Sequence, residues 1–297
     1  MANVKIFWDP MGFELESRGK HELLRSTDGD TPYISLPIRM LSIDTPEVHY
    51  PGNEKPSNWD ARLVELANWI DQGKAPINND LGKKLKPKLA HGKAGTLQLS
   101  QGKTATLKFV ELLEQSLTKP SGSKRKLYLR SADESFDSYG RLLAYISPHY
   151  TKKELVSLSR LERATINLQM VKTGWAASFP IYPSLPRYTD LVFLQEAAKE
   201  AYENKHGAWS DPLMLTGYEY RMCVKLYKVT KKIMNNETLS SNEKNSWVTR
   251  FCFDMITREV FFPQDYYKVK PYNRIFIWPQ DLVEAVAKLN LLPKDTV

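Results

Sequence analysis

The chain has 297 residues, of which 42% are hydrophobic and 26% are charged, as is usual for a soluble globular protein. This length accommodates one large domain or two ordinary ones. No apolar run approaches the roughly 18 residues that cross a bilayer, so we expect no membrane span. The first residues lack a basic leader followed by an apolar segment, which predicts a cytoplasmic protein without a secretory signal.

The sequence contains two cysteines, Cys223 and Cys252. Two are too few for a disulfide framework, and nothing near them resembles a zinc site. Both lie in sequence that looks like β-strand, so we expect buried thiols, with a single disulfide bridge as the alternative.

Positive charge is concentrated in one part of the chain. Residues 81–130 contain twelve Lys or Arg and two acids, a local charge of +10 against +8 for the whole chain, which leaves −2 for the rest. Such a concentration binds polyanions by releasing their counterions. Basic surfaces also occur on proteins that touch no nucleic acid, so the charge alone leaves both interpretations open.

The first half of the chain predicts strands followed by a helix and a basic arm. Strands are expected at residues 4–8, 21–26, 31–36 and 39–43. Apolar residues at helical spacing predict a helix over residues 58–71. The Lys- and Gly-rich stretch 82–103 is expected to be a solvated loop or mobile arm.

The second half alternates helices and strands before its character changes. Helices are expected at 104–117, 155–172 and 190–205, and strands at 126–130 and 141–146. After Trp209 the sequence predicts strands at 218–229, 247–255, 259–262 and 274–278, and a last helix at 280–289. We therefore expect a first domain over residues 1–212 and a small β-rich domain over residues 213–297.

Three short clusters combine charged and turn-forming residues, and each has an ordinary structural explanation when taken alone. Asp28-Gly29-Asp30-Thr31 is typical of a β-turn. Asp44-Thr45-Pro46-Glu47, preceded by Arg39, resembles a capped helix N-terminus. Tyr139-Gly140-Arg141 is typical of a hairpin corner. Their joint occurrence in this order favours a common site.

The three clusters together supply what phosphodiester hydrolysis needs. A hard divalent cation requires oxygen ligands, which Asp30 and Asp44 could provide if their strands pair. Glu47 could orient or deprotonate a water, and guanidinium groups suit the charge that builds on the phosphate. Arg39 precedes Asp44 by five positions and would face the opposite side of an extended strand, so the two converge only if the chain turns or bulges between them.

These motifs resemble the signature of the staphylococcal nuclease family. The match consists of Arg39-x4-Asp44-Thr45-Pro46-Glu47, the preceding Asp-Gly-Asp-Thr, and the later Tyr139-Gly140-Arg141. The resemblance extends, with interruptions, over residues 20–210. It implies an α+β fold with an OB-type five-stranded β-barrel and flanking helices. It also implies a calcium ion held by Asp30, Asp44 and the main-chain carbonyl of Thr45.

The same resemblance implies roles for the remaining site residues. Glu47 would position or activate the attacking water, while Arg39 and Arg141 would clamp the scissile phosphate. Tyr139 would sit against the substrate phosphate or sugar, and Tyr182 would offer an aromatic face to the nucleotide. The expected activity is cleavage of DNA and RNA with little sequence preference, leaving 3′-phosphate ends.

Two regions depart from the family pattern. Residues 50–101 form a long insert that carries most of the basic arm, and Lys83 and Lys84 within it are expected to bind substrate. Residues 213–297 have no counterpart in the minimal family domain, and their aromatic residues, including Trp247 and Trp278, could stack on bases or simply form a core. A protein partner could bind through either region.

Two alternatives to an active nuclease stay open. The first is a non-catalytic nucleic-acid-binding or scaffold protein on the same barrel, although the acidic and Arg positions are all present here. The second is an enzyme kept silent until a partner or ligand moves the insert.

Overall fold

The computed structural model describes residues 20–50 and 53–293, in which helices and strands are mixed, as expected for the α+β class. The contacts divide the chain into two compact units. Unit 1 consists of the described part of Met1–Arg39 together with Ser131–Ala144, and unit 2 of Met40–Arg130 and Tyr145–Val297 as far as described. The strand predicted at residues 4–8 lies outside the described residues.

Unit 1 is built from β-hairpins. Strands β1 (Leu23–Ser26) and β2 (Pro32–Ile34) pair antiparallel, with Arg25 opposite Tyr33, so the turn between them contains the Asp-Gly-Asp-Thr cluster. Strands β3 (Ile38–Met40), β6 (Leu142–Pro148) and β5 (Leu127–Phe136) form a three-stranded sheet in that order, and residues 38–39, 131–136 and 142–144 of it belong to unit 1. The strands predicted at 21–26, 31–36, 126–130 and 141–146 are confirmed, with shifted bounds.

The main sheet of unit 2 has five strands in the order β12-β10-β9-β11-β8. Their bounds are β8 (Ile181–Tyr182), β9 (Phe251–Asp254), β10 (Glu259–Phe261), β11 (Arg274–Ile277) and β12 (Leu292–Pro293). A separate pair joins β4 (Ile43–Asp44) to β7 (Ala177–Ser178) in antiparallel register. A closed five-stranded barrel is not seen among the described strands and stays a prediction.

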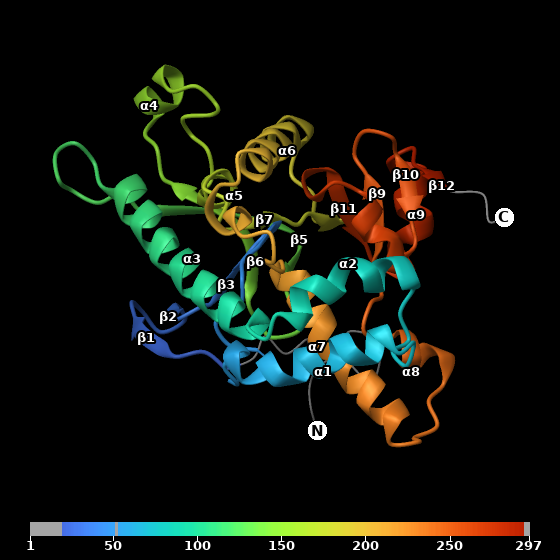
Figure 1. Cartoon of the computed structure of the whole chain (residues 1–297). Helices are drawn as coiled ribbons and strands as arrows, with labels where there is room; N and C mark the ends of the chain where they lie inside the picture. The colour runs from blue at the N-terminus through green and yellow to red at the C-terminus, as the bar shows by residue number, and fades with distance from the viewer. Residues whose placement is uncertain (1–19, 51–52, 294–297) are drawn as a thin grey trace, which may run out of the picture. The chain divides into compact units, whose positions relative to one another are not determined.

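The helices of unit 2 are labelled in Figure 1. In chain order the longer ones are α1 (Asp60–Asp71), α2 (Asn79–Ala90), α3 (Ala94–Leu117), α6 (Tyr188–Glu203) and α7 (Gly217–Met234). The shorter ones are α4 (Lys152–Ser157), α5 (Ile166–Lys172), α8 (Ser241–Asn245) and α9 (Leu282–Lys288). Short 3₁₀ helices cover Pro56–Trp59, Gly207–Ser210, Pro263–Lys268, Pro271–Asn273 and Pro279–Asp281. No helix of the described residues is both long and apolar enough to cross a bilayer.

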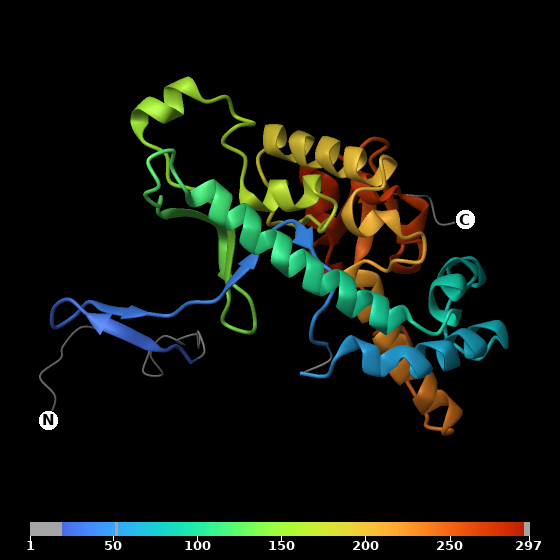
Figure 2. The ribbon, with the colours of Figure 1, turned by 60° about the vertical axis from the view of Figure 1, so that its left-hand side comes forward.

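The prediction of a basic arm at residues 82–103 is wrong, because this stretch forms most of α2 and the first part of α3. Figure 2 shows α3 as one continuous long helix. Its glycines permit close packing rather than flexibility: a Cβ at Gly95 would stand 2.0 Å from the carbonyl oxygen of Pro56. The glycines Gly95 and Gly102, which helped to predict a loop, therefore permit α3 to pack against the neighbouring backbone.

Two other element predictions are also wrong. The strand expected at 218–229 is helix α7, which begins with a capping box formed by Thr216 and Glu219. The single helix expected at 155–172 is two helices, because Thr151 caps α4 and Thr165 caps α5. In both places local capping decides the structure, and the apolar pattern did not reveal it.

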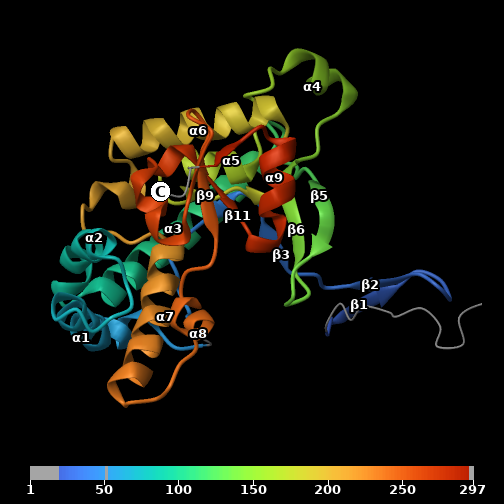
Figure 3. The ribbon, with the colours of Figure 1, turned by 90° about the vertical axis from the view of Figure 1, so that its right-hand side faces the viewer.

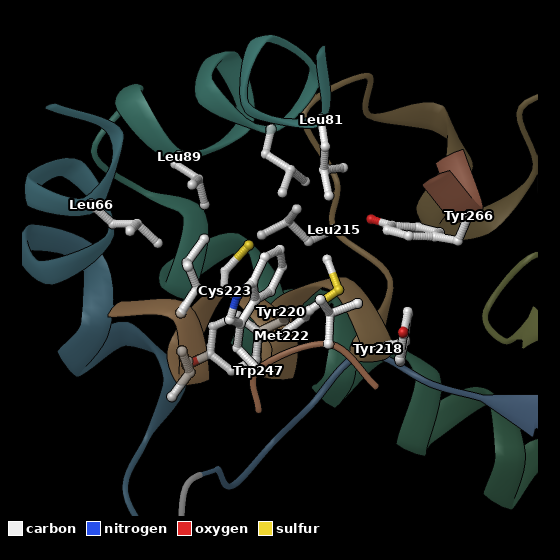
Figure 4. Packing of buried hydrophobic residues seen from close by; sticks show 14 of the residues in the cluster. Leu66, Leu81, Leu89, Leu215, Tyr218, Tyr220, Met222, Cys223, Trp247 and Tyr266 are labelled. Atoms are coloured by element: carbon white, nitrogen blue, oxygen red, sulfur yellow. The ribbon is translucent and has the colours of Figure 1, made fainter. Parts of the chain in front are cut away.

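The largest hydrophobic cluster of unit 2 lies between α1, α2 and α7 (Figure 4). Leu66, Leu81 and Leu89 pack there against Leu215 and Met222. Both cysteines are buried in this cluster as free thiols, which confirms the expectation of buried cysteines. Residues from both sides of position 212 share this cluster, so the packing of the cluster crosses the domain boundary predicted at that position. The boundary itself stays a prediction.

Candidate functional site

Asp44 is fixed by the pairing of two short strands. β4 pairs with β7 so that Asp44 stands opposite Ala177, and the side chain is 1% exposed. Just before it the chain turns at Ser42, whose φ of 59° is unusual for a residue with a side chain. The Ser42 hydroxyl lies 2.6 Å from the Tyr145 hydroxyl. The single strand predicted at 39–43 is therefore broken into β3 and β4, and the turn anticipated between Arg39 and Asp44 is present.

Both carboxylate oxygens of Asp44 accept hydrogen bonds from the start of α7. The backbone N–H of Tyr218 donates to Oδ2 at 2.5 Å, and Nη2 of Arg221 donates to Oδ1 at 2.8 Å. A helix N-terminus presents unpaired N–H groups and a positive dipole end, which favour a carboxylate. The buried charge of Asp44 is thus stabilised by helix α7, which was predicted to be a strand.

Glu47 shares the same arginine. Nη1 of Arg221 forms a salt bridge with Oε1 of Glu47, so one guanidinium spans both carboxylates. The side chains of Arg221 and Glu47 are 23% and 22% exposed. Burial alone would lower the pKa of Arg221, but the carboxylates of Asp44 and Glu47 outweigh it and raise the pKa. The two carboxylates therefore stabilise the charged form of Arg221.

The Thr45 carbonyl and the Asp44 carboxylate converge at Gly217. A Cβ on this residue would lie 2.4 Å from the Thr45 carbonyl oxygen and 2.6 Å from Oδ2 of Asp44. Only a residue without a side chain permits this approach of α7 to the loop after β4. Two of the three oxygen groups predicted to bind calcium thus lie beside one another.

Helix α3 holds the backbone of Glu47. The Gln98 amide accepts from the Glu47 N–H at 2.8 Å and donates to the Leu215 carbonyl at 3.0 Å, once its amide is oriented to satisfy both groups. Gly102 lies so close that a Cβ there would stand 2.7 Å from the Glu47 carbonyl oxygen. The insert therefore contributes structure to the site, through a side chain that bridges the Glu47 loop and the segment before α7.

The other predicted residues of the acidic and Arg set belong to unit 1. Asp30 accepts a hydrogen bond from the Thr31 hydroxyl at 3.1 Å. Arg141 donates to Asp137 from Nε at 2.8 Å, and its guanidinium carbon lies 5.3 Å from the centre of the Tyr139 ring, which is 81% exposed. Arg39, half-buried in β3, lies in the same unit. Asp44 and Glu47 belong to unit 2. That the residues of unit 1 meet them in one site therefore stays a prediction.

The predicted substrate contacts outside this set have other surroundings. Tyr182 is only 5% exposed and packs in a core cluster with Ile275 and Ile277, so it offers no aromatic face to a nucleotide. Lys83 and Lys84 are on helix α2 rather than on a flexible arm. Lys83 is exposed and lies 3.6 Å from Asp80, and Lys84 is near the Tyr267 ring.

Sequence analysis missed Arg221, Gly217 and Gln98. Thr216-Gly217-Tyr218-Glu219 is a capping-box pattern, and recognising it would have predicted the start of α7. Nothing local to Arg221 shows that it pairs with residues 174 and 177 positions away. Gln98 and Gly102 likewise act through packing that the sequence does not display.

The chain matches one protein-family model over more than half of its length. Residues 37–211 match the family described as staphylococcal nuclease homologue, and this chain therefore belongs to that family of nucleases. The chain is also similar to the Endonuclease YhcR of Bacillus subtilis (strain 168), with 25% identity over 261 residues. That alignment covers 85% of this chain and 15% of the relative, so the chain spans a small part of the relative's length.

Proposed function

We propose that this chain is a calcium-dependent nuclease that hydrolyses phosphodiester bonds of DNA, RNA or both with low sequence specificity, leaving 3′-phosphate ends. The family membership supports nuclease chemistry in general. Two observations carry the finer proposal. The Thr45 carbonyl and the Asp44 carboxylate lie side by side at Gly217, and the guanidinium of Arg221 joins the carboxylates of Asp44 and Glu47.

The residues of the site suit a hard cation by their chemistry. Carboxylate and main-chain carbonyl oxygens are the ligands that calcium takes, and Asp44 and Thr45 supply one of each. No cluster of three His, Cys, Asp or Glu that could hold a metal is found among the described residues of the chain. We propose that Asp30 of unit 1 completes the set with Asp44, and that the cation replaces the contact of Arg221 with Asp44.

The proposed chemistry assigns each remaining side chain a separate task. Calcium, when bound, supplies positive charge to the phosphate and acidifies water. Glu47 accepts a proton from the attacking water through its carboxylate oxygen, which requires release from Arg221. Arg39 and Arg141 donate hydrogen bonds to the phosphate oxygens on which negative charge builds. Tyr139, which is exposed, contacts the substrate beside Arg141.

A non-catalytic nucleic-acid-binding protein is the second candidate. The specific observation in its favour is that Arg221 neutralises both Asp44 and Glu47. The carboxylate oxygens that accept from this guanidinium, Oδ1 of Asp44 and Oε1 of Glu47, are less available to a metal or to a proton of water. The two candidates therefore differ in whether calcium can displace Arg221 from these carboxylates.

A digestion assay on plasmid DNA, single-stranded DNA and RNA separates the two. The proposal predicts degradation with calcium, protection with a chelator, and 3′-phosphate ends on the products. Glu47→Gln and Arg141→Ala should each lower the rate by 10²-fold or more. Full activity of the double variant would show that the site is wrongly assigned, and binding without any cleavage would favour the second candidate.

A further inference from the structure

Helix α7 exposes only basic residues along most of its length. Between positions 217 and 230 eleven residues are buried, and the three that are not are Arg221, Lys225 and Lys228. Lys232, also exposed, follows four residues later. Spacings of four, three and four residues place all four side chains on one face of a helix. We call this set the α7 basic row.

One end of the α7 basic row lies at the candidate site, because the first member of the row belongs to that site. Arg221 contacts Asp44 and Glu47, and the lysines continue from it along the helix. Neighbours at these spacings have Cβ atoms about 5–6 Å apart. At about 1.5 Å per residue the row extends about 16 Å from the site. Figure 3 shows α7 extending from the sheet region of unit 2 toward α8.

The two lysines in the middle of the row have no acidic partner. Lys225 and Lys228 form no salt bridge within the described residues. The pKa of Lys225 is lowered by partial burial, and then by the charges of Arg250, Arg221 and Lys228, all of which are cations. Lys232 has Glu243 nearby, but that carboxylate already accepts from Ser240. Like charges at such spacing destabilise a helix, so a partner that supplies negative charge is favoured.

An aromatic group lies beside the row. The guanidinium of Arg250, an electrostatic neighbour of Lys225, is 4.0 Å from the centre of the Trp278 ring. Both side chains are half-buried and keep part of their surface accessible. A guanidinium stacked on an indole offers a flat cationic surface, which suits the bases of a single strand. The row thus combines evenly spaced cations with one stacking surface.

We propose that the α7 basic row binds the phosphate backbone of the nucleic-acid strand that the site cleaves and leads this strand to Asp44 and Glu47. This inference rests on the proposed function. A linear array of cations matches a linear polyanion, and its continuity with the site selects a nucleic-acid strand over other anions. Helix α7 lies beyond the family match at residues 37–211, so the C-terminal region adds this surface to the nuclease domain.

Binding of a fluorescent single-stranded oligonucleotide, measured in chelator over a series of salt concentrations, tests the proposal without cleavage. Each phosphate contact contributes about 0.7 to the slope of log affinity against log salt for a single strand. The double variant Lys225→Gln, Lys228→Gln should therefore lose about 1.4 of the slope and bind at least tenfold more weakly at low salt. The matched control is Lys152→Gln, Lys153→Gln on α4, which lies far from α7 in unit 2 (Figures 1 and 3) and should keep the wild-type slope.

A cross-link locates the strand directly. Because both native cysteines are buried, Lys228→Cys introduces one exposed thiol, to which a maleimide photo-cross-linker can be attached. Ultraviolet light should then couple this position, but not Lys153→Cys, to the oligonucleotide.

The outcomes separate this inference from the proposed function. If the wild type binds no oligonucleotide, both fail. If it binds but the α7 variant keeps the wild-type slope and Lys228→Cys does not cross-link, the inference alone fails. An α7 variant that binds DNA normally but no longer binds phosphatidylserine vesicles would also overturn it, because the partner would then be a membrane surface.

Discussion

The guanidinium of Arg221 lies 2.8 Å from the carboxylate of Asp44, which is 1% exposed. The pair joins helix α7 of the C-terminal region to the strand that carries the nuclease signature. A buried carboxylate requires a positive partner, and Arg221 fills that role in this structure. In the proposed enzyme, calcium replaces Arg221 as the positive partner of Asp44, so the arginine and the metal compete for one carboxylate.

Removal of Arg221 should make the protein more dependent on calcium. In chelator, Arg221→Gln leaves Asp44 buried without its cation, and the free energy of unfolding should fall by about 3–5 kcal/mol. Calcium at a hundred times its dissociation constant should restore about 2.7 kcal/mol, as for any ligand of the folded state. We expect calcium to raise the melting temperature more in Arg221→Gln than in the wild type, as measured by thermal unfolding.

Lys153→Gln is the control, because it removes one positive charge at an exposed position. Its response to calcium should equal that of the wild type. An equal calcium response in Arg221→Gln would show that the arginine and the cation do not compete.

Gly217→Ala should separate α7 from the loop after β4. The new methyl would stand 2.4 Å from the Thr45 carbonyl oxygen, and backbone atoms cannot move aside as a flexible side chain can. We expect a loss of at least 2 kcal/mol of stability in denaturant unfolding, which is in the upper range for point mutations. Gly29→Ala, where the added methyl meets nothing within 4 Å, should have little effect on stability. A Gly217→Ala variant as stable as the wild type would contradict the close approach.

Glu219 should make stability depend on acidic pH. Burial raises the pKa of its carboxyl, but Lys88 and Arg274 lower it more strongly, so the folded-state pKa lies below the ordinary value of 4.5. A lowered folded-state pKa gives stability that is present above 4.5 and is lost as the pH falls through the folded value. Glu219→Gln should be about 3 kcal/mol less stable than the wild type at pH 7, with a difference that shrinks toward pH 3.

Urea unfolding at a series of pH values measures this difference. Glu243→Gln is the matched control, because Glu243 closes the same kind of capping box on α8 but is exposed. Its effect should stay within about 1 kcal/mol at neutral pH. A constant difference between Glu219→Gln and the wild type from pH 7 to pH 3 would contradict the assignment.

The sequence predicted the hairpin strands and the acidic turn because their signals are local. Alternating strands, Gly140 at a tight turn with φ of 74°, and Asp44-Thr45-Pro46-Glu47 all act within a few residues. It predicted α7 as a strand, because the aromatic and β-branched residues of this helix are typical of strands and its exposed face is narrow. Tyr220, Val224 and Tyr227 read as strand residues for this reason.

The candidate site was predictable only in part for a related reason. Family motifs predicted Asp44, Thr45 and Glu47 as site residues, and these three lie close together in unit 2. The groups that hold them come from elsewhere in the chain: Arg221 from α7 and Gln98 from the insert. The sequence also predicted an exposed ring at Tyr182, but this residue is buried where β8 pairs with β11.

Calcium binding to the whole chain tests the central claim most directly, namely that Asp30 of unit 1 and Asp44 of unit 2 share one ion. Isothermal titration should give one calcium per chain in the wild type. Asp30→Asn and Asp44→Asn should each weaken that binding by at least tenfold, and the double variant should lose little more than either single variant, because both act on the same ion. Binding that survives both substitutions, or losses that simply add as for two independent sites, would contradict the account.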